Sequence, residues 1–312
     1  MITLRGLTKR FGATTAVDNL TLDLAPGRVT GFLGPNGAGK STTMRMIVGL
    51  DRPTAGEALI EGRRYATLRH PLREVGALLD AKAVHPGRNA RNHLLAMARS
   101  NGIPTRRVDE VLATVGLTTV AGKRAGTYSL GMGQRLGIAG ALLGDPGVLM
   151  FDEPVNGLDP DGVRWVRQLM RSLAAEGRTV FVSSHLMSEM QLTADQLVVV
   201  GKGRLLADAP IAEVIGGSSS TAVLVRSPQP AGLAELRRRL VAAGVAVQQE
   251  ADGALVVTGA GVERVGDLAH EIGVRLHELS VREASLEEAY MELTADDVEY
   301  GALATTRSGA RR

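Results

Sequence analysis

The feature that most constrains this chain is a glycine-rich stretch, Gly34 to Thr42, which fits the pattern GxxxxGK[ST] in full. It lies between a short apolar run at 29–33, typical of a buried strand, and a run at 42–50 with apolar residues at helical spacing. A loop in this position presents its backbone N–H groups to a ligand at the positive end of a helix dipole. The sequence therefore predicts a phosphate-binding loop between a strand and a helix.

The residues of this loop have separate expected roles. Gly34, Gly37 and Gly39 allow positive φ and turn the backbone N–H groups towards the phosphates. Lys40 is expected to reach the β- and γ-phosphates of a nucleotide, and Ser41 to place its hydroxyl on Mg²⁺. The residues predicted to bind the nucleotide in this loop are Gly34, Pro35, Asn36, Gly37, Ala38, Gly39, Lys40, Ser41 and Thr42.

The composition argues against several classes of protein. A length of 312 residues with 44% apolar residues predicts a sizeable core, in one large and one small domain or in two equal ones. The longest apolar runs fall far short of the ~20 residues of a membrane span, and neither cysteines nor a signal-peptide layout indicate secretion. A formal charge of +3 with scattered basic residues does not support nucleic-acid binding. We therefore expect a cytosolic protein.

The order of apolar patterns predicts an α/β fold with two additions. Period-two alternation at 2–8 and 17–24 indicates antiparallel strands, with a further strand at 57–61 and a buried one at 75–79. The middle third, about 89–144, repeats apolar residues at helical spacing and is interpreted as a helical insert. Strand and helix then alternate, as in a parallel sheet, over 148–151, 160–175, 179–183 and 197–200.

A change of composition at 216–220, Gly-Gly-Ser-Ser-Ser, predicts a linker and a second domain over 221–295. Its pattern reads strand, helix, strand, strand, helix, strand, the ferredoxin-like order, followed by a helix at 286–293. Residues 296–312 are expected to form a disordered tail. The prediction is thus an α/β core with a small α+β domain behind it.

Two candidate catalytic positions follow strands. The apolar run 148–151 ends in Asp152, expected in the Mg²⁺ shell, and Glu153, which is expected to orient or deprotonate the attacking water. His185 follows the strand at 179–184, where it could emerge at the carboxyl edge of the sheet and bond the γ-phosphate. The alternative for an isolated histidine is an ordinary surface or core imidazole.

These motifs stand in the order of the ATP-binding cassette of ABC transporters, which residues 1–215 closely resemble. The resemblance identifies Tyr128 to Arg135 as the signature segment, and it implies that Ser129 and Gly131 contact the ATP held by a second copy of the cassette. Leu130 departs from the family pattern, which has a glycine at this position. A dimer with ATP between the two copies is therefore expected.

The resemblance implies three further site residues, each with a simpler alternative. Phe11 would stack on adenine, or it is a core phenylalanine. Asp159 would lie in the loop that contacts the partner cassette, although an N-cap role explains it equally. Asp80 would face Mg²⁺ where the family usually has glutamine, or it caps the next turn.

The sequence therefore predicts an ATP-hydrolysing subunit that drives a separate membrane-spanning permease and is peripheral on the inner face of the membrane. The appended domain and the ending 285–294 resemble daunorubicin- and bacitracin-resistance exporters, so export of a drug, antibiotic or other hydrophobic compound is expected, with import still open. Two alternatives are a soluble cassette ATPase acting on nucleic acid or ribosomes, and a low-turnover regulatory module, which Asp80 and Leu130 motivate.

Overall fold

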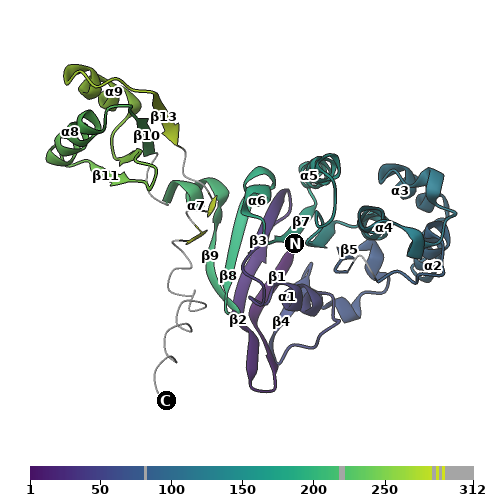
Figure 1. The fold of residues 1–312 in the computed structure, drawn as a ribbon. Coiled ribbons are helices and arrows are strands. Elements are labelled where there is room, and N and C mark those ends of the chain that lie inside the picture. Colours follow the sequence, from purple (N-terminus) through teal and green to yellow (C-terminus); the bar gives the residue numbers. More distant parts are fainter. Residues whose placement is uncertain (81–82, 218–221, 283–285, 288–289, 292–312) are drawn as a thin grey trace, which may run out of the picture. The chain divides into compact units, whose positions relative to one another are not determined.

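The computed structural model describes the chain except residues 81–82, 218–221, 283–285, 288–289 and 292–312 (Figure 1). The chain forms two compact units, residues 1–211 and residues 212–293. Within the described residues, no helix is both long enough and apolar enough to cross a membrane.

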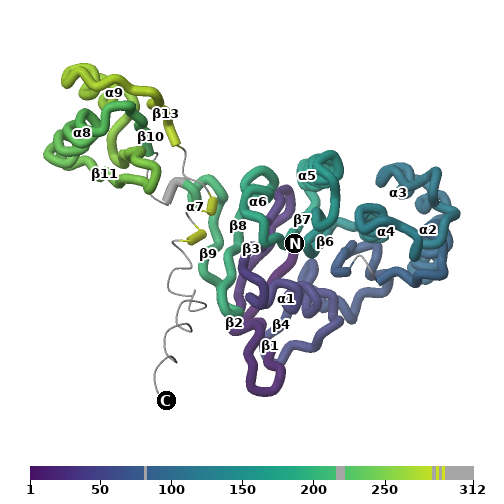
Figure 2. Tube along the Cα trace, viewed as in Figure 1, coloured from purple at the N-terminus to yellow at the C-terminus, as the bar shows by residue number. Residues whose placement is uncertain are grey.

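A mixed sheet forms the centre of the first unit. Its strand order is β5-β6-β7-β3-β8-β9, and all neighbours are parallel except β9, which pairs antiparallel with β8 at the edge. In Figure 2, β3 from the start of the chain lies beside β8 from much later in the sequence. The strands are β3 (Arg28–Leu33), β5 (Val75–Leu78), β6 (Val148–Asp152), β7 (Thr179–Ser184), β8 (Gln196–Gly201) and β9 (Arg204–Pro210).

A second, antiparallel sheet covers one face of this sheet, with a helix between them. Its order is β2-β1-β4, from β1 (Ile2–Phe11), β2 (Thr14–Leu24) and β4 (Ala55–Ile60). Phe32 and Phe181 of the parallel sheet join one apolar core with Met44 of α1 (Lys40–Ile47) and with apolar residues of the antiparallel sheet. The Phe32 and Phe181 ring centroids lie 5.0 Å apart. The helix after the glycine loop is therefore held on both sides.

The opposite face of the parallel sheet carries α5 (Pro160–Ala175) and α6 (Met187–Thr193), which contact β3 and β7. The approach is close, because a Cβ added at Gly31 would lie 2.8 Å from Met190 Sδ. Asp159 caps α5, with its carboxylate accepting from the Gly162 N–H at 2.8 Å and a proline at the first helical position. This boundary is the predicted one.

The predicted insert is helical. It contains α2 (Ala90–Ser100), α3 (Arg106–Thr114) and α4 (Leu130–Leu142), and α4 also packs on β5 and β6. Asn89 and Ser129 cap α2 and α4 with their side-chain oxygens. Short 3₁₀ turns lie at Tyr65–Thr67, Pro71–Arg73, Thr118–Val120 and Ala125–Thr127.

The second unit has the predicted order of elements. An antiparallel sheet of order β11-β12-β10-β13 packs against two helices around its own apolar core. The elements are β10 (Ala222–Arg226), α8 (Pro230–Ala242), β11 (Ala246–Gln249), β12 (Leu255–Thr258), α9 (Val262–Glu271) and β13 (Glu278–Arg282).

The sequence did not predict α6 and β9 of the first unit, nor α7 (Ile211–Gly217) where the two units join along the chain. The helix α7 includes the first two residues of the predicted linker, so that part of the linker prediction is wrong, while 218–220 lies outside the described residues. The expected closing helix at 286–293 is described only at 286–287 and 290–291, and the expected tail, 296–312, lies outside the described residues.

Candidate functional site

The candidate site lies where three neighbouring strands end. Because β3, β6 and β7 are parallel, their carboxyl ends meet at one edge of the sheet, with Leu33 opposite Ser184 and Asp152 opposite Ser183. Gly34, Glu153 and His185 follow these strands directly. The register thus brings together residues that are far apart in the sequence.

Close packing around the glycine loop explains its composition. Gly39 has φ of 97° and precedes α1, and a Cβ there would lie 2.3 Å from the Ala16 carbonyl oxygen. A Cβ on Gly34 would lie 2.5 Å from the Val200 carbonyl oxygen. Gly37 has φ of 87° but open space around it. Glycine is therefore required at 34 and 39 for space, and at 37 and 39 for backbone conformation.

Lys40 is buried, with 6% of its surface exposed. Its Nζ donates to the carbonyl oxygens of Gly34 at 2.5 Å and Pro35 at 3.3 Å. Burial lowers the pKa of Lys40, and the nearby charges of Glu153 and Asp152 act in the opposite direction. A cation held in this way within the loop is suited to bind anionic phosphate oxygens.

The two acids after β6 are held by β7. The Ser183 hydroxyl donates to Asp152 Oδ1, and it accepts from the Glu153 N–H at 3.1 Å. Glu153 has φ of 50°, a conformation unusual for a residue with a side chain. Its Oε2 lies 2.9 Å from His185 Nδ1, in a pair whose side chains are 21% and 43% exposed. His185 is thus a partly exposed imidazole paired with Glu153, which excludes the core alternative.

Gln134 is a site residue that the sequence did not predict. It is buried in α4, and its Nε2 donates to the backbone carbonyls of Glu153 at 3.1 Å and Asn156 at 3.4 Å. Its Oε1 is buried without a hydrogen-bond partner among the described residues. The side chain therefore ties the predicted signature helix to the loop that carries Glu153.

The segment of the predicted signature contacts the loop 156–159. Ser129 caps α4, with its hydroxyl accepting from the Met132 N–H at 3.3 Å. Leu130 is 51% exposed, and its Cδ2 lies 2.1 Å from where a Cβ on Gly157 would be. Gly131 faces Leu158. Leu130 and Gly131 therefore lie against this loop, while the described contact of the Ser129 hydroxyl is with its own helix.

Three family models match the chain. The ABC transporter model matches residues 17–156, a model for a domain of unknown function (DUF8746) matches residues 221–287, and a model for an AAA domain, putative AbiEii toxin, Type IV TA system, matches residues 124–190.

Two curated relatives and one solved structure extend this result. The bacitracin transport ATP-binding protein BcrA of Bacillus licheniformis is 43% identical over 207 residues, 65% of this chain and 68% of the relative. The uncharacterized ABC transporter ATP-binding protein YhcH of Bacillus subtilis (strain 168) is 35% identical over 306 residues, 96% of this chain and 97% of the relative. This chain belongs to the ABC transporter ATP-binding proteins.

The solved structure is similar in fold. It is the dimeric post-hydrolysis state of the ATP-binding cassette MJ0796 bound to ADP and Pi, with a TM-score of 0.62 and 24% identity over 68% of this chain and 99% of that chain. The ABC chain thus has the ATPase fold predicted from its sequence, and it binds and hydrolyses ATP.

The remaining predicted residues of the ABC chain lie at the ends of strands and helices. Phe11 ends β1, is 52% exposed and lies 4.8 Å from Lys9 Nζ, so the core alternative for Phe11 is wrong. Asp159 has the capping role described above. Asp80 follows β5, is exposed, and its carbonyl accepts from the Ala83 N–H at 3.2 Å, with 81–82 outside the described residues.

Proposed function

We propose that this ABC ATPase subunit drives export of an antibiotic or another hydrophobic compound through a separate membrane-spanning permease. The observation that carries the proposal is the pairing of Glu153 with His185 beside the buried Lys40, together with the similarity to a protein named for bacitracin transport. A chain with this pairing has the groups that ATP hydrolysis requires.

The proposed roles follow from the geometry. Lys40 binds the β- and γ-phosphates. Glu153, fixed by Ser183 and Gln134 through its backbone, accepts a proton from the attacking water or orients it. His185, within 2.9 Å of Glu153 Oε2, supplies a hydrogen bond to the γ-phosphate side of the site. Phe11 presents an exposed ring suited to stack on adenine.

Mg²⁺ is the proposed second cofactor. The donors that fit it are the hydroxyl of Ser41 at the start of α1 and the carboxylate of Asp152, which Ser183 holds in one orientation. No group of three or more His, Cys, Asp or Glu that could hold a metal occurs in the described part of the chain. The ion is therefore bound jointly with the nucleotide phosphates, whose charge it neutralises. Asp80 is a further candidate to face it.

We also propose that the ATP-binding site is completed by a second copy of the cassette. The Ser129 hydroxyl and the first N–H groups of α4 lie at a helix N-terminus, which favours anionic groups. Among the described residues, the Ser129 hydroxyl accepts from Met132 within its own helix, Gly131 lies against Leu158, and neither has a contact with Lys40. This supports a dimer in which each nucleotide contacts both copies. We place the dimer beside the permease, on the inner face of the membrane.

The proposed division of labour assigns ATP chemistry to residues 1–215 and a regulatory or stabilising role to the accessory domain at 221–295. Every predicted catalytic and nucleotide-binding residue lies in the first compact unit. A low-turnover module remains the second candidate, because Leu130 replaces a glycine in the signature segment and is 51% exposed.

Two variants test the proposal against that candidate. Glu153→Gln keeps ATP affinity but stops turnover, and it accumulates as an ATP-bound dimer on size exclusion, whereas Lys40→Ala loses ATP binding. Export is measured as antibiotic resistance of cells that express the chain with its permease. Normal turnover by Glu153→Gln would exclude the proposed role of Glu153. Antibiotic resistance equal to that of cells with the parent chain, in either variant, would exclude the export assignment.

A further inference from the structure

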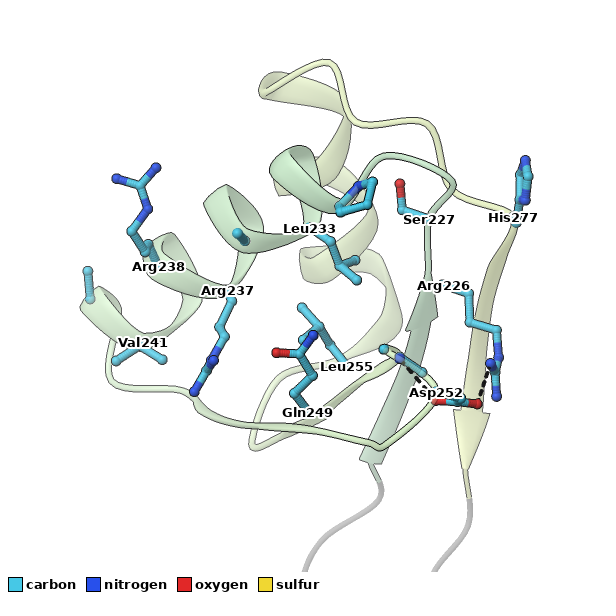
Figure 3. Close-up of a pocket in the computed structure, with 15 residues that line it drawn as sticks. Arg226, Ser227, Leu233, Arg237, Arg238, Val241, Gln249, Asp252, Leu255 and His277 are labelled. Atoms are coloured by element: carbon cyan, nitrogen blue, oxygen red, sulfur yellow. Dashed lines mark hydrogen bonds and ion pairs between the residues drawn. The ribbon is translucent and has the colours of Figure 1, made fainter.

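The second unit contains a cavity of about 860 Å³ between α8, the end of β10 and the turn from β11 to β12 (Figure 3). Cavities that bind small molecules are typically about 300–1,000 Å³. The nucleotide chemistry described above does not use this cavity, because all of those residues lie in the first unit.

One face of α8 lines the cavity along the whole helix. The spacing of its lining residues along the chain alternates between three residues and one, as one side of a helix requires. The lining residues of α8 are Pro230, Leu233, Ala234, Arg237, Arg238, Val241 and Ala242. Leu236 and Leu240 face only the core of the domain, and Leu233 belongs both to that core and to the cavity lining. Val241 is 54% exposed at the cavity. The helix thus has a second partly apolar face that its own core does not cover.

The floor of the cavity is apolar. Leu233 and Leu255 are buried there, and the aliphatic Ala234, Val241 and Ala242 extend this surface. The polar side chain of Gln249 lies at the same cavity, below α8 in Figure 3. Its amide makes no hydrogen bond within the described part of the chain. An apolar surface with one free amide fits a ligand with a hydrocarbon or ring body and a polar end.

The charge at the cavity is positive. Asp252 is the one acid among its lining residues, and it is already neutralised by Arg226 at 2.6 Å. Arg226 also pairs with Glu278 at 3.0 Å, and Arg238 pairs with Glu235.

Arg237 differs from these arginines. In the described residues its guanidinium forms no ion pair or hydrogen bond, although it lines the cavity next to Val241. A free guanidinium beside an apolar surface is suited to bind a carboxylate, sulfonate or phosphate.

We propose that this cavity binds a small anionic amphiphile, with its acidic group on Arg237 and its apolar body on the face of α8 from Leu233 to Val241. The anion enters as a free molecule and not as part of a bilayer. The proposal is independent of ATP hydrolysis, since neither its residues nor its test involve the nucleotide site.

Calorimetric titration of the full chain with dodecanoate below its micelle concentration tests the proposal. Saturable binding at one site is expected, with no binding of dodecyltrimethylammonium, which has the same tail and the opposite charge. Arg237→Gln weakens dodecanoate binding about tenfold or more, because a charge-assisted hydrogen bond is lost. The matched control, Arg264→Gln on α9, changes an exposed arginine that does not line the cavity and leaves the affinity unchanged.

A second variant locates the site. Ala234 is exposed on the cavity face of α8, so Ala234→Trp fills the cavity without disturbing the core and abolishes dodecanoate binding. Circular dichroism and ATP affinity like the parent verify that each variant is folded.

Four results of these titrations would overturn the proposal. They are no saturable dodecanoate binding, equal binding of the cationic probe, dodecanoate binding that survives Ala234→Trp, and a loss of affinity in Arg264→Gln equal to that in Arg237→Gln. Flotation with phosphatidylglycerol vesicles that depends on Arg237, without dodecanoate binding, would also overturn it, because the ligand would then be bilayer lipid.

Discussion

Gln134→Met tests whether α4 positions Glu153, the proposed catalytic glutamate, within one chain. Methionine keeps the volume of glutamine nearly unchanged and removes the amide that donates to the Glu153 and Asn156 carbonyls. The backbone of Glu153 has positive φ, which costs about 1–3 kcal/mol and needs surrounding bonds to persist. Loss of one of these bonds is therefore expected to loosen Glu153, the residue proposed to contact the attacking water.

The expected magnitudes are modest. The bond at 3.1 Å has normal geometry and contributes about 1 kcal/mol, while the bond at 3.4 Å is long and contributes less. Removal of the unpartnered Oε1 from the interior offsets part of this loss. We expect the free energy of unfolding to fall by about 1 kcal/mol. We expect kcat to fall about fivefold to tenfold, since about 1 kcal/mol of positioning of Glu153 is lost.

Urea unfolding, steady-state ATP hydrolysis and ATP affinity measure these effects separately. ATP affinity stays at the parent value, because Gln134 has no described contact with the phosphate loop. Gln168→Met, an exposed position on α5, is the matched control and leaves all three quantities unchanged. An unchanged kcat in Gln134→Met, with the expected loss of stability, would show that the side chain only packs.

Three further predictions follow from the same structure. Gly39→Ala weakens ATP binding more than Gly37→Ala. Both positions have positive φ, which costs a residue with a side chain about 1–2 kcal/mol, but only at 39 does the new Cβ also overlap backbone atoms. Burial, and to a smaller extent Arg88, lowers the pKa of His93, so the folded chain binds this proton less readily than the unfolded chain does. Stability therefore falls as pH drops below about 6.5, where the unfolded chain binds the proton, and His93→Gln flattens this dependence. Asp80→Asn tightens ATP binding, because a carboxylate near the phosphates would repel them.

Each of these predictions has its own readout. Fluorescent-nucleotide titration ranks the glycine variants, and equal losses at the two positions would show that overlap does not matter. Urea unfolding at several pH values compares His93→Gln with the parent, and parallel curves would place the acid sensitivity elsewhere. An unchanged ATP affinity in Asp80→Asn would favour a role for Asp80 in capping its turn.

The positions in the fold of the glycine-rich loop, the two acids and His185 were predictable because each depends on local order along the chain. The motif lies between a strand and a helix, and Asp152 and His185 follow apolar strands whose parallel register brings their ends together. The boundaries of α5 were predictable for the same reason, since a capping aspartate and a proline are local signals.

Gln134 was not predictable, because its partners are backbone carbonyls in another part of the fold, and no spacing in the sequence reports such a contact. The edge strand β9 is largely exposed and carries mixed residues, so its alternation is weak. The short helix α6 covers a glycine in β3 and is stabilised by that packing more than by its own sequence. The cavity of the second unit needed the structure, since the pattern of α8 does not separate its two partly apolar faces.

Because Leu130 contacts Gly157, the residues allowed at these two positions depend on each other. The leucine occupies the space that any side chain at 157 would need, and Gly157 has φ of 75° besides. A residue with a side chain at 157 therefore requires the Leu130 side chain to move or to be replaced by a smaller one. A change of Leu130 to glycine, made to restore the usual signature, would remove this contact and open a gap beside the loop 156–159. A variant of this chain with the usual signature segment therefore needs changes at both 130 and 157.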